Sequence, residues 1–127
     1  RLYKQLGDFN NVQLLGKLSH SDTMNEISRS KALISTSPME GFPDIFIEAW
    51  ACGVPVLSLY VDPGGVIKRE KLGYVTEGSI DRMIEEMDSF RVSEDFSRHS
   101  RLYVMTHHAL NDIRLEEIKS LFNGLHL

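Results

Sequence analysis

Short apolar runs alternate along the chain with longer stretches that mix apolar and polar positions. Each run is rich in Val, Ile or Leu and is bounded by glycine, asparagine, proline or a charged residue. That length and composition are typical of strands buried on both faces. The predicted strands are Val12–Leu15, Ala32–Thr36, Val56–Tyr60 and a brief Gly73–Thr76 near an edge of the sheet.

Helices are predicted between and after these runs, where cap residues mark their ends. Because strands and helices alternate, we expect parallel strand pairing and an α/β fold with flanking helices. The predicted helices are a helix end at Arg1–Leu6, one from Ser21 to about Ser30, Asp44–Cys52 stopping at Gly53, a short helix through Lys71 after the turn Asp62–Gly65, Ile80–Phe90 capped by Ser79, one from Ser93 to about His107, and one from Asn111 or Asp112 to near Gly124.

Composition places few further limits on this picture. The chain has 127 residues, and we expect residues 1–127 to form a single domain with its own core. Its net charge of −4 argues against a nucleic-acid partner. The longest apolar run, around Ala49–Tyr60, is broken by Gly53 and Pro55 and is too short to span a bilayer, so we expect a soluble chain. The single cysteine, Cys52, excludes an internal disulfide and fits a reducing compartment.

One charged residue stands inside the most apolar stretch. From Ile45 to Val61, Glu48 is the only charged residue, on a helix that is apolar on nearly every side and therefore expected to be buried. A buried carboxylate is costly unless it is paired or hydrogen-bonded, so Glu48 needs a protein partner or a polar ligand such as a pair of ribose hydroxyls. The sequence shows no obvious nearby cation. Glu40 precedes it by eight positions, a spacing that can place both carboxylates in one cleft.

The residues between the two glutamates define the start of a helix. Gly41 permits close approach of a ligand to the backbone, and Pro43 holds Phe42 extended while suiting the first helical position. The first free amides and the positive dipole end then face the space beside Glu40, which suits a phosphate. The same residues also fit a plain loop and a helix with a structural glutamate, and on spacing alone both interpretations stay open.

Read together, Glu40-Gly41-Phe42-Pro43 and Glu48-Ala49-Trp50-Ala51-Cys52-Gly53-Val54-Pro55-Val56 closely resemble the donor-binding signature of glycosyltransferase family 4. These are retaining enzymes with the GT-B fold, among the glycosyl transferases of group 1. The resemblance implies the C-terminal, donor-binding half of such an enzyme, with a Rossmann-like parallel sheet and upstream strands missing. It continues through Asn11–Gly16, Lys31–Pro38, Val61–Ile67 and Leu72–Tyr74.

The activity that the resemblance implies is transfer of a sugar, with retention, from a nucleotide sugar to an acceptor. A UDP- or GDP-sugar is the expected donor, and a glycan or lipid-linked molecule is the expected acceptor, as in polysaccharide biosynthesis. The nucleotide sugar is a substrate, and neither a metal ion nor another cofactor is expected. The five histidines show no metal-ligand spacing with Cys52 or with a carboxylate cluster.

The resemblance also assigns roles to the signature residues. Glu40 is expected to contact the donor sugar and to be the catalytic residue, and Glu48 is expected to bind the ribose. Backbone amides after Glu40 are expected to approach the sugar and the phosphates. The expected donor-binding residues are Gly41, Phe42, Pro43, Asp44 and Glu48.

Two of these positions depart from the family pattern. Pro43 stands where glycine is frequent and has no amide proton to donate. A carboxylate at Asp44 would repel phosphates unless it caps the helix, so we expect it to cap. Lys17 is a poor match to the family's phosphate-gripping cations, and Gly64-Gly65 is either a phosphate-approaching turn or a simple turn.

Several expectations concern what accompanies this chain. The resemblance implies an N-terminal acceptor domain and two earlier strands that are missing here, one of them between Val12–Leu15 and Ala32–Thr36, so we expect a fragment of a longer protein that binds weakly alone. Exposed strand edges favour oligomers. We expect a cytoplasmic location or one at the inner face of a membrane. Two other functions remain open: a non-catalytic interaction module on this scaffold, and a nucleotide-sugar epimerase.

Overall fold

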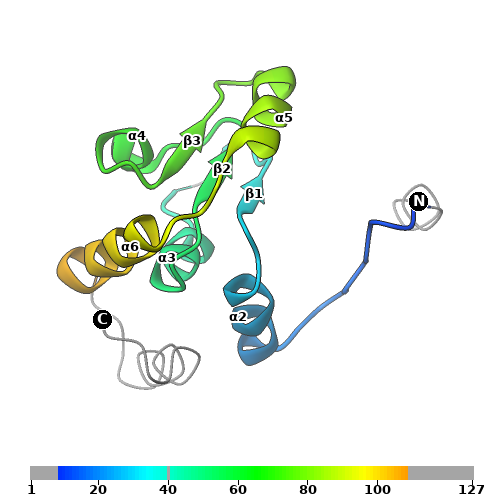
Figure 1. The fold of residues 1–127 in the computed structure, drawn as a ribbon, viewed down its shortest axis with the longest axis horizontal. Helices are drawn as coiled ribbons and strands as arrows, with labels where there is room; N and C mark the ends of the chain where they lie inside the picture. The colour runs from blue at the N-terminus through cyan, green and yellow to red at the C-terminus, as the bar shows by residue number, and fades with distance from the viewer. Residues whose placement is uncertain (1–8, 40, 109–127) are drawn as a thin grey trace.

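The computed structural model describes residues 9–39 and 41–108. Within them, a three-stranded sheet is flanked by helices (Figure 1). The elements, in chain order, are α2 (His20–Ser28), β1 (Leu33–Ser35), α3 (Asp44–Ala51), β2 (Val56–Ser58), the 3₁₀ turn η1 (Pro63–Gly65), α4 (Val66–Arg69), β3 (Gly73–Val75), α5 (Ile80–Ser89) and α6 (Glu94–His107).

The strands pair in parallel in the order β1-β2-β3. Leu33 stands opposite Val56, and Val56 stands opposite Gly73 in the next strand. A parallel pair needs a crossover connection, and α3 and α4 lie in the two connections. The predicted α/β fold with a parallel sheet is therefore confirmed, as is the edge position of Gly73–Thr76.

Side chains of β2 alternate between two separate packing layers. Leu57 packs with Met83 of α5 on one face of the sheet. On the other face Val56 belongs to the main core, together with Trp50 of α3 and Val104 of α6. All five side chains are at most 5 % exposed. Burial on both faces explains why β2 has no polar position except Ser58.

Three hydrogen bonds fasten the C-terminal end of α3 to its neighbours. The Trp50 indole Nε1 donates to the Leu72 carbonyl at 3.0 Å, just before β3. From α6, Ser100 Oγ donates to the Trp50 carbonyl at 3.0 Å and Ser97 Oγ donates to the Gly53 carbonyl at 2.7 Å. The Trp50 carbonyl also accepts a hydrogen bond from the Gly53 amide at 2.9 Å, so Ser100 adds a second bond there, while Ser97 supplies a partner for the carbonyl of Gly53 just beyond the helix end.

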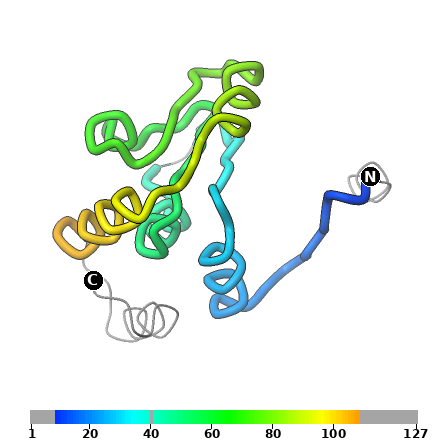
Figure 2. The backbone as a smooth tube through the Cα atoms, in the orientation of Figure 1, coloured from blue at the N-terminus to red at the C-terminus, as the bar shows by residue number. Residues whose placement is uncertain are grey.

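The prediction of a strand at Val12–Leu15 is wrong. This segment has no regular structure, and Val12 and Leu15 are 38 % and 41 % exposed. Figure 2 shows it as part of an extended arm that leads to α2 away from the sheet. A strand needs a neighbour for its backbone groups, and β1 pairs with β2 alone among the described strands. Apolar composition is thus insufficient without an adjacent strand.

The first helix begins earlier than predicted. Ser19, rather than Ser21, is its N-cap, because the Ser19 hydroxyl accepts a hydrogen bond from the Asp22 amide at 3.1 Å. The predicted caps Ser79 and Ser93 are confirmed by the same kind of bond. The helices predicted at Arg1–Leu6 and near Asn111–Gly124 lie outside the described residues.

Candidate functional site

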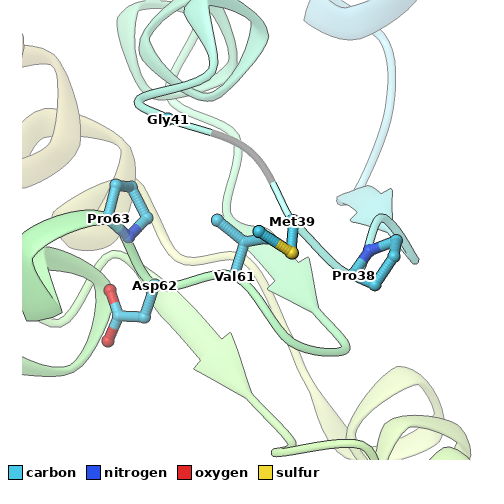
Figure 3. A pocket seen from close by; sticks show the side chains of 6 residues that line it. All are labelled: Pro38, Met39, Gly41, Val61, Asp62 and Pro63. Atoms are coloured by element: carbon cyan, nitrogen blue, oxygen red, sulfur yellow. The ribbon is translucent and has the colours of Figure 1, made fainter.

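A cleft opens at the carboxyl ends of β1 and β2. One wall is the loop that follows β1, and the other is the turn that follows β2; the cleft has a volume of about 570 Å³. Figure 3 shows the lining side chains, with Met39 on the loop after β1 and Val61 on the segment after β2. In open parallel sheets, ligands bind at this end of the strands. The lining residues are Pro38, Met39, Gly41, Val61, Asp62 and Pro63.

Asp62 organises the second wall. Its Oδ1 accepts a hydrogen bond from the Ile67 amide at 2.7 Å, and its backbone carbonyl accepts one from the Gly65 amide at 3.0 Å. Gly64 and Gly65 adopt φ values of +62° and +70°, which side-chain-bearing residues rarely tolerate. The two glycines therefore form the turn that lets Asp62 reach the amides of α4.

The N-terminal end of α3 adjoins the first wall through Gly41. Pro43 is its N-cap residue and makes no side-chain cap hydrogen bond. The expected capping role of Asp44 is wrong, because Asp44 is the first residue of the helix and lies beyond the cap position. Its carboxylate is instead an acidic group in the first turn, where the helix dipole favours negative charge.

Phe42 anchors this helix start from outside the cleft lining. Its ring meets Trp50 edge-on, with centroids 6.2 Å apart, and lies 5.2 Å from the His108 ring at the end of α6. The side chain is 43 % exposed. The ring thus joins α3 to the end of α6 and is partly open to solvent.

Glu48 is buried, as predicted, and has a protein partner. Its side chain is 11 % exposed, and Oε1 lies 3.1 Å from Nε2 of His20, the first residue of α2. No feature of the sequence pointed to this partner, since 28 positions separate the two residues and His20 belongs to no motif. The only signal available was the physical need of a buried carboxylate for one. Glu48 is not among the residues that line the cleft.

Cys52 follows Glu48 by one helical turn and is also buried. Burial, and next the nearby Glu48 carboxylate, raise the pKa of its thiol from 9.0 to about 12. The thiol is therefore neutral at physiological pH and belongs to the core. Among the described residues, no group of three or more His, Cys, Asp or Glu side chains could hold a metal ion.

The family model described as Glycosyl transferases group 1 matches residues 1–102. The chain belongs to this family. Neither a curated protein nor a solved structure matches it. The parallel α/β sheet is consistent with a Rossmann-like C-terminal fragment of the GT-B fold found in such enzymes. Membership supports glycosyl transfer from a nucleotide-sugar donor to an acceptor in general terms.

For this group 1 glycosyl transferase chain, the structure brings together only some of the expected site residues. Gly41 lines the cleft, and Pro43 and Asp44 form the adjoining helix start. Glu48 faces α2 through His20. Glu40, the expected catalytic residue, lies outside the described residues, so the expectation that both glutamates share one cleft stays a prediction.

The part of the group 1 transferase that the structure describes contains no helix both long and apolar enough to cross a bilayer.

Proposed function

We propose that this chain supplies part of the donor site of a retaining GT-B glycosyltransferase. The observation that carries the proposal is the cleft at the carboxyl ends of β1 and β2, with Gly41 on its wall and the start of α3 beside it. A UDP- or GDP-sugar would bind there. The acceptor, a glycan or a lipid-linked molecule, would be held by a separate N-terminal domain.

Backbone groups are proposed to bind the donor phosphates. Gly41 is exposed and no other part of the described chain comes within 4 Å of the place where a Cβ would stand. A ligand can therefore approach its backbone closely. The amides of Gly41, Phe42 and Asp44 are proposed to donate hydrogen bonds, and Pro43 contributes shape alone. The exposed Asp44 carboxylate would keep the phosphates on the Gly41 side of the helix end.

Two carboxylates are proposed to bind the sugars. Glu40 would contact the donor sugar where the bond to the diphosphate breaks. Glu48 would accept hydrogen bonds from the ribose hydroxyls, which would join or replace His20 at the carboxylate. His20 has a side chain that is 43 % exposed, so it can leave that position at little packing cost. Until then it keeps the buried Glu48 paired.

The proposed chemistry breaks the anomeric carbon–oxygen bond of the donor and releases the nucleoside diphosphate. The acceptor hydroxyl forms the new bond to that carbon with retained configuration and gives its proton to the departing diphosphate. The contribution of this half of the enzyme would be to orient the donor and to stabilise the negative charge on the departing diphosphate.

Ligand-observed NMR with UDP, GDP, ADP and their sugar conjugates tests the donor assignment. Glu48→Ala should weaken binding of the bare nucleotide more than Glu40→Ala does. Glu40→Ala should mainly reduce the preference for the sugar conjugate over the bare nucleotide. Glu85→Ala, which removes an exposed carboxylate on α5, is the matched control and should change neither.

Equal and negligible effects of the two signature substitutions would refute the assigned roles. Product analysis with the full-length protein then separates the enzyme classes. An acceptor that carries a new glycosidic linkage of retained configuration supports the transferase. An isomerised nucleotide sugar without transfer identifies an epimerase. Nucleotide binding without formation of any product indicates a non-catalytic module.

A further inference from the structure

The outer edge of β3 presents free backbone groups. The Val56 amide donates to the Leu72 carbonyl at 3.2 Å, and the Thr76 amide donates to the Ser58 carbonyl at 3.0 Å. In a parallel pair, alternate residues direct their backbone groups to the same neighbour. The N–H and C=O groups of Gly73 and Val75 therefore face away from β2. Within the described chain no strand pairs with that side, as the edge position of β3 in Figure 1 shows.

A groove of about 470 Å³ runs along this edge and is separate from the cleft at β1 and β2. Its lining includes Gly73 and Val75 themselves. Three aromatic rings form one wall: Tyr74 lies edge-on to Phe90 at 5.6 Å, and Phe90 lies edge-on to Phe96 at 6.0 Å. The groove thus combines an apolar surface with strand backbone.

Three cations complete the lining, namely Lys68, Lys71 and Arg82. Lys68 pairs with Glu77, and the charge of Arg82 also acts on the Glu77 carboxylate and helps to lower its pKa, whereas no ion pair among the described residues involves Lys71. The groove therefore has an excess of positive charge on a chain whose net charge is −4. A local charge opposite to that of the whole protein favours an anionic partner.

We propose that this groove binds an extended acidic peptide, which adds to β3 as a further strand. Gly73 and Val75 exchange backbone hydrogen bonds with it, alternate side chains of the peptide contact the aromatic wall, and its carboxylates pair with Lys71 and Arg82. Lipid headgroups and free phosphates can pair with the cations, but they have no alternating N–H donors and C=O acceptors to hydrogen-bond the backbone at the strand edge. The proposal is independent of the donor cleft.

The test uses the ¹⁵N-labelled 127-residue protein and an acetylated, amidated peptide of alternating glutamate and valine with a central phenylalanine. Saturable amide shifts are expected at Gly73 and Val75, with a smaller shift at Tyr74, whose amide faces β2. The same peptide with N-methyl groups on its pairing face keeps its charges but cannot form the ladder, and it should lose binding.

Charge reversal provides the second arm of the test. Lys71→Glu combined with Arg82→Glu should weaken peptide binding about tenfold or more, since two exposed ion pairs are lost and the reversed charges repel the peptide carboxylates. Lys31→Glu makes the same kind of charge reversal, half as large in total, at one exposed residue beside β1, and should change affinity less than about twofold. If the double variant fails to fold, Lys71→Gln with Arg82→Gln replaces it.

Three results would overturn the proposal. The first is a lack of amide shifts at Gly73 and Val75, and the second is equal binding of the N-methylated peptide. The third is binding to vesicles of anionic phospholipid that depends on Lys71 and Arg82 while the peptide does not bind, which would assign the groove to a lipid surface.

Discussion

The two halves of the Gly41–Gly53 segment lie in different surroundings although they share one helix. In the open half, Gly41–Ile45, Phe42 and Ile45 are 43 % and 38 % exposed, and Gly41 lines the cleft. In the core half, Phe46–Gly53, the side chains of Phe46 and Trp50 are fully buried. One end of α3 is therefore held rigidly by packing while the other end is presented to solvent. A site on a rigid element keeps its geometry more precisely than one on a loop.

Residues that are adjacent in one motif therefore have different physical roles. Substitutions in the core half should change the free energy of unfolding. Those in the open half should leave it nearly unchanged and alter ligand binding instead. Four experiments test this division, in order of decreasing effect.

Trp50→Ala should cause the largest loss of stability. It removes a fully buried ring, its contacts with Phe46 and Tyr103, and the hydrogen bond to the Leu72 carbonyl. Denaturant unfolding should show a loss of about 3–5 kcal/mol, or an unfolded protein. Phe42→Ala, in the open half, should cost far less. Comparable losses for the two rings would remove the distinction between the halves.

Gly53→Ala and Gly41→Ala form a matched pair. Gly53 has φ +77°, and a Cβ there would lie 2.6 Å from Arg101 Nη1 and 2.8 Å from Ser97 Cβ, whereas a Cβ at Gly41 meets, beyond its chain neighbours, no atom of the described residues within 4 Å. The first substitution should cost about 1–3 kcal/mol. The second should be close to neutral in thermal unfolding while weakening donor binding. If Gly53→Ala leaves the free energy of unfolding unchanged, Arg101 and Ser97 of α6 can move aside for the added methyl group without an energetic cost.

Alkaline pH should destabilise the core half through Cys52. The pKa of its thiol is raised from 9.0 to about 12 in the folded protein, so between these pH values the unfolded chain loses the thiol proton more readily. The free energy of unfolding is therefore unaffected by this group below about pH 9 and falls as the pH rises toward 12. The slope is about 1.4 kcal/mol per pH unit. Stability curves from pH 8 to 11 should fall more steeply for the natural chain than for Cys52→Ala. Parallel curves would indicate that solvent reaches the thiol.

Acidic pH should have the smallest effect, at the point where the open half meets α6. Burial, and next the neighbouring His107, lower the pKa of His108 below its usual value. A lowered folded pKa means that the contribution to stability is present above about pH 6.5 and is lost as the pH falls through the folded pKa. His108→Gln should reduce the dependence of the thermal unfolding temperature on pH between pH 7.5 and 5. An unchanged profile would exclude His108 as the source.

Much of the fold was predictable because its signals are local. Apolar runs, the caps Ser79 and Ser93, and the glycine stop at Gly53 act within a few residues and gave the parallel α/β order correctly. The Val12–Leu15 prediction failed because a strand also needs a neighbour. The Asp44 cap prediction failed because a shift of one residue moves a side chain from the cap position into the helix.

The sequence alone determined the alternation of elements, the burial of α3 and the need of Glu48 for a partner. The identity of this partner, His20, became known from the three-dimensional packing, as did the hydrogen bonds from Ser97 and Ser100 of α6 to the end of α3, across 44 and 50 positions. Helix and strand preferences depend on near neighbours along the chain. Which distant polar group hydrogen-bonds a buried one depends on how the elements pack, and that packing depends on the contacts among all of the elements together.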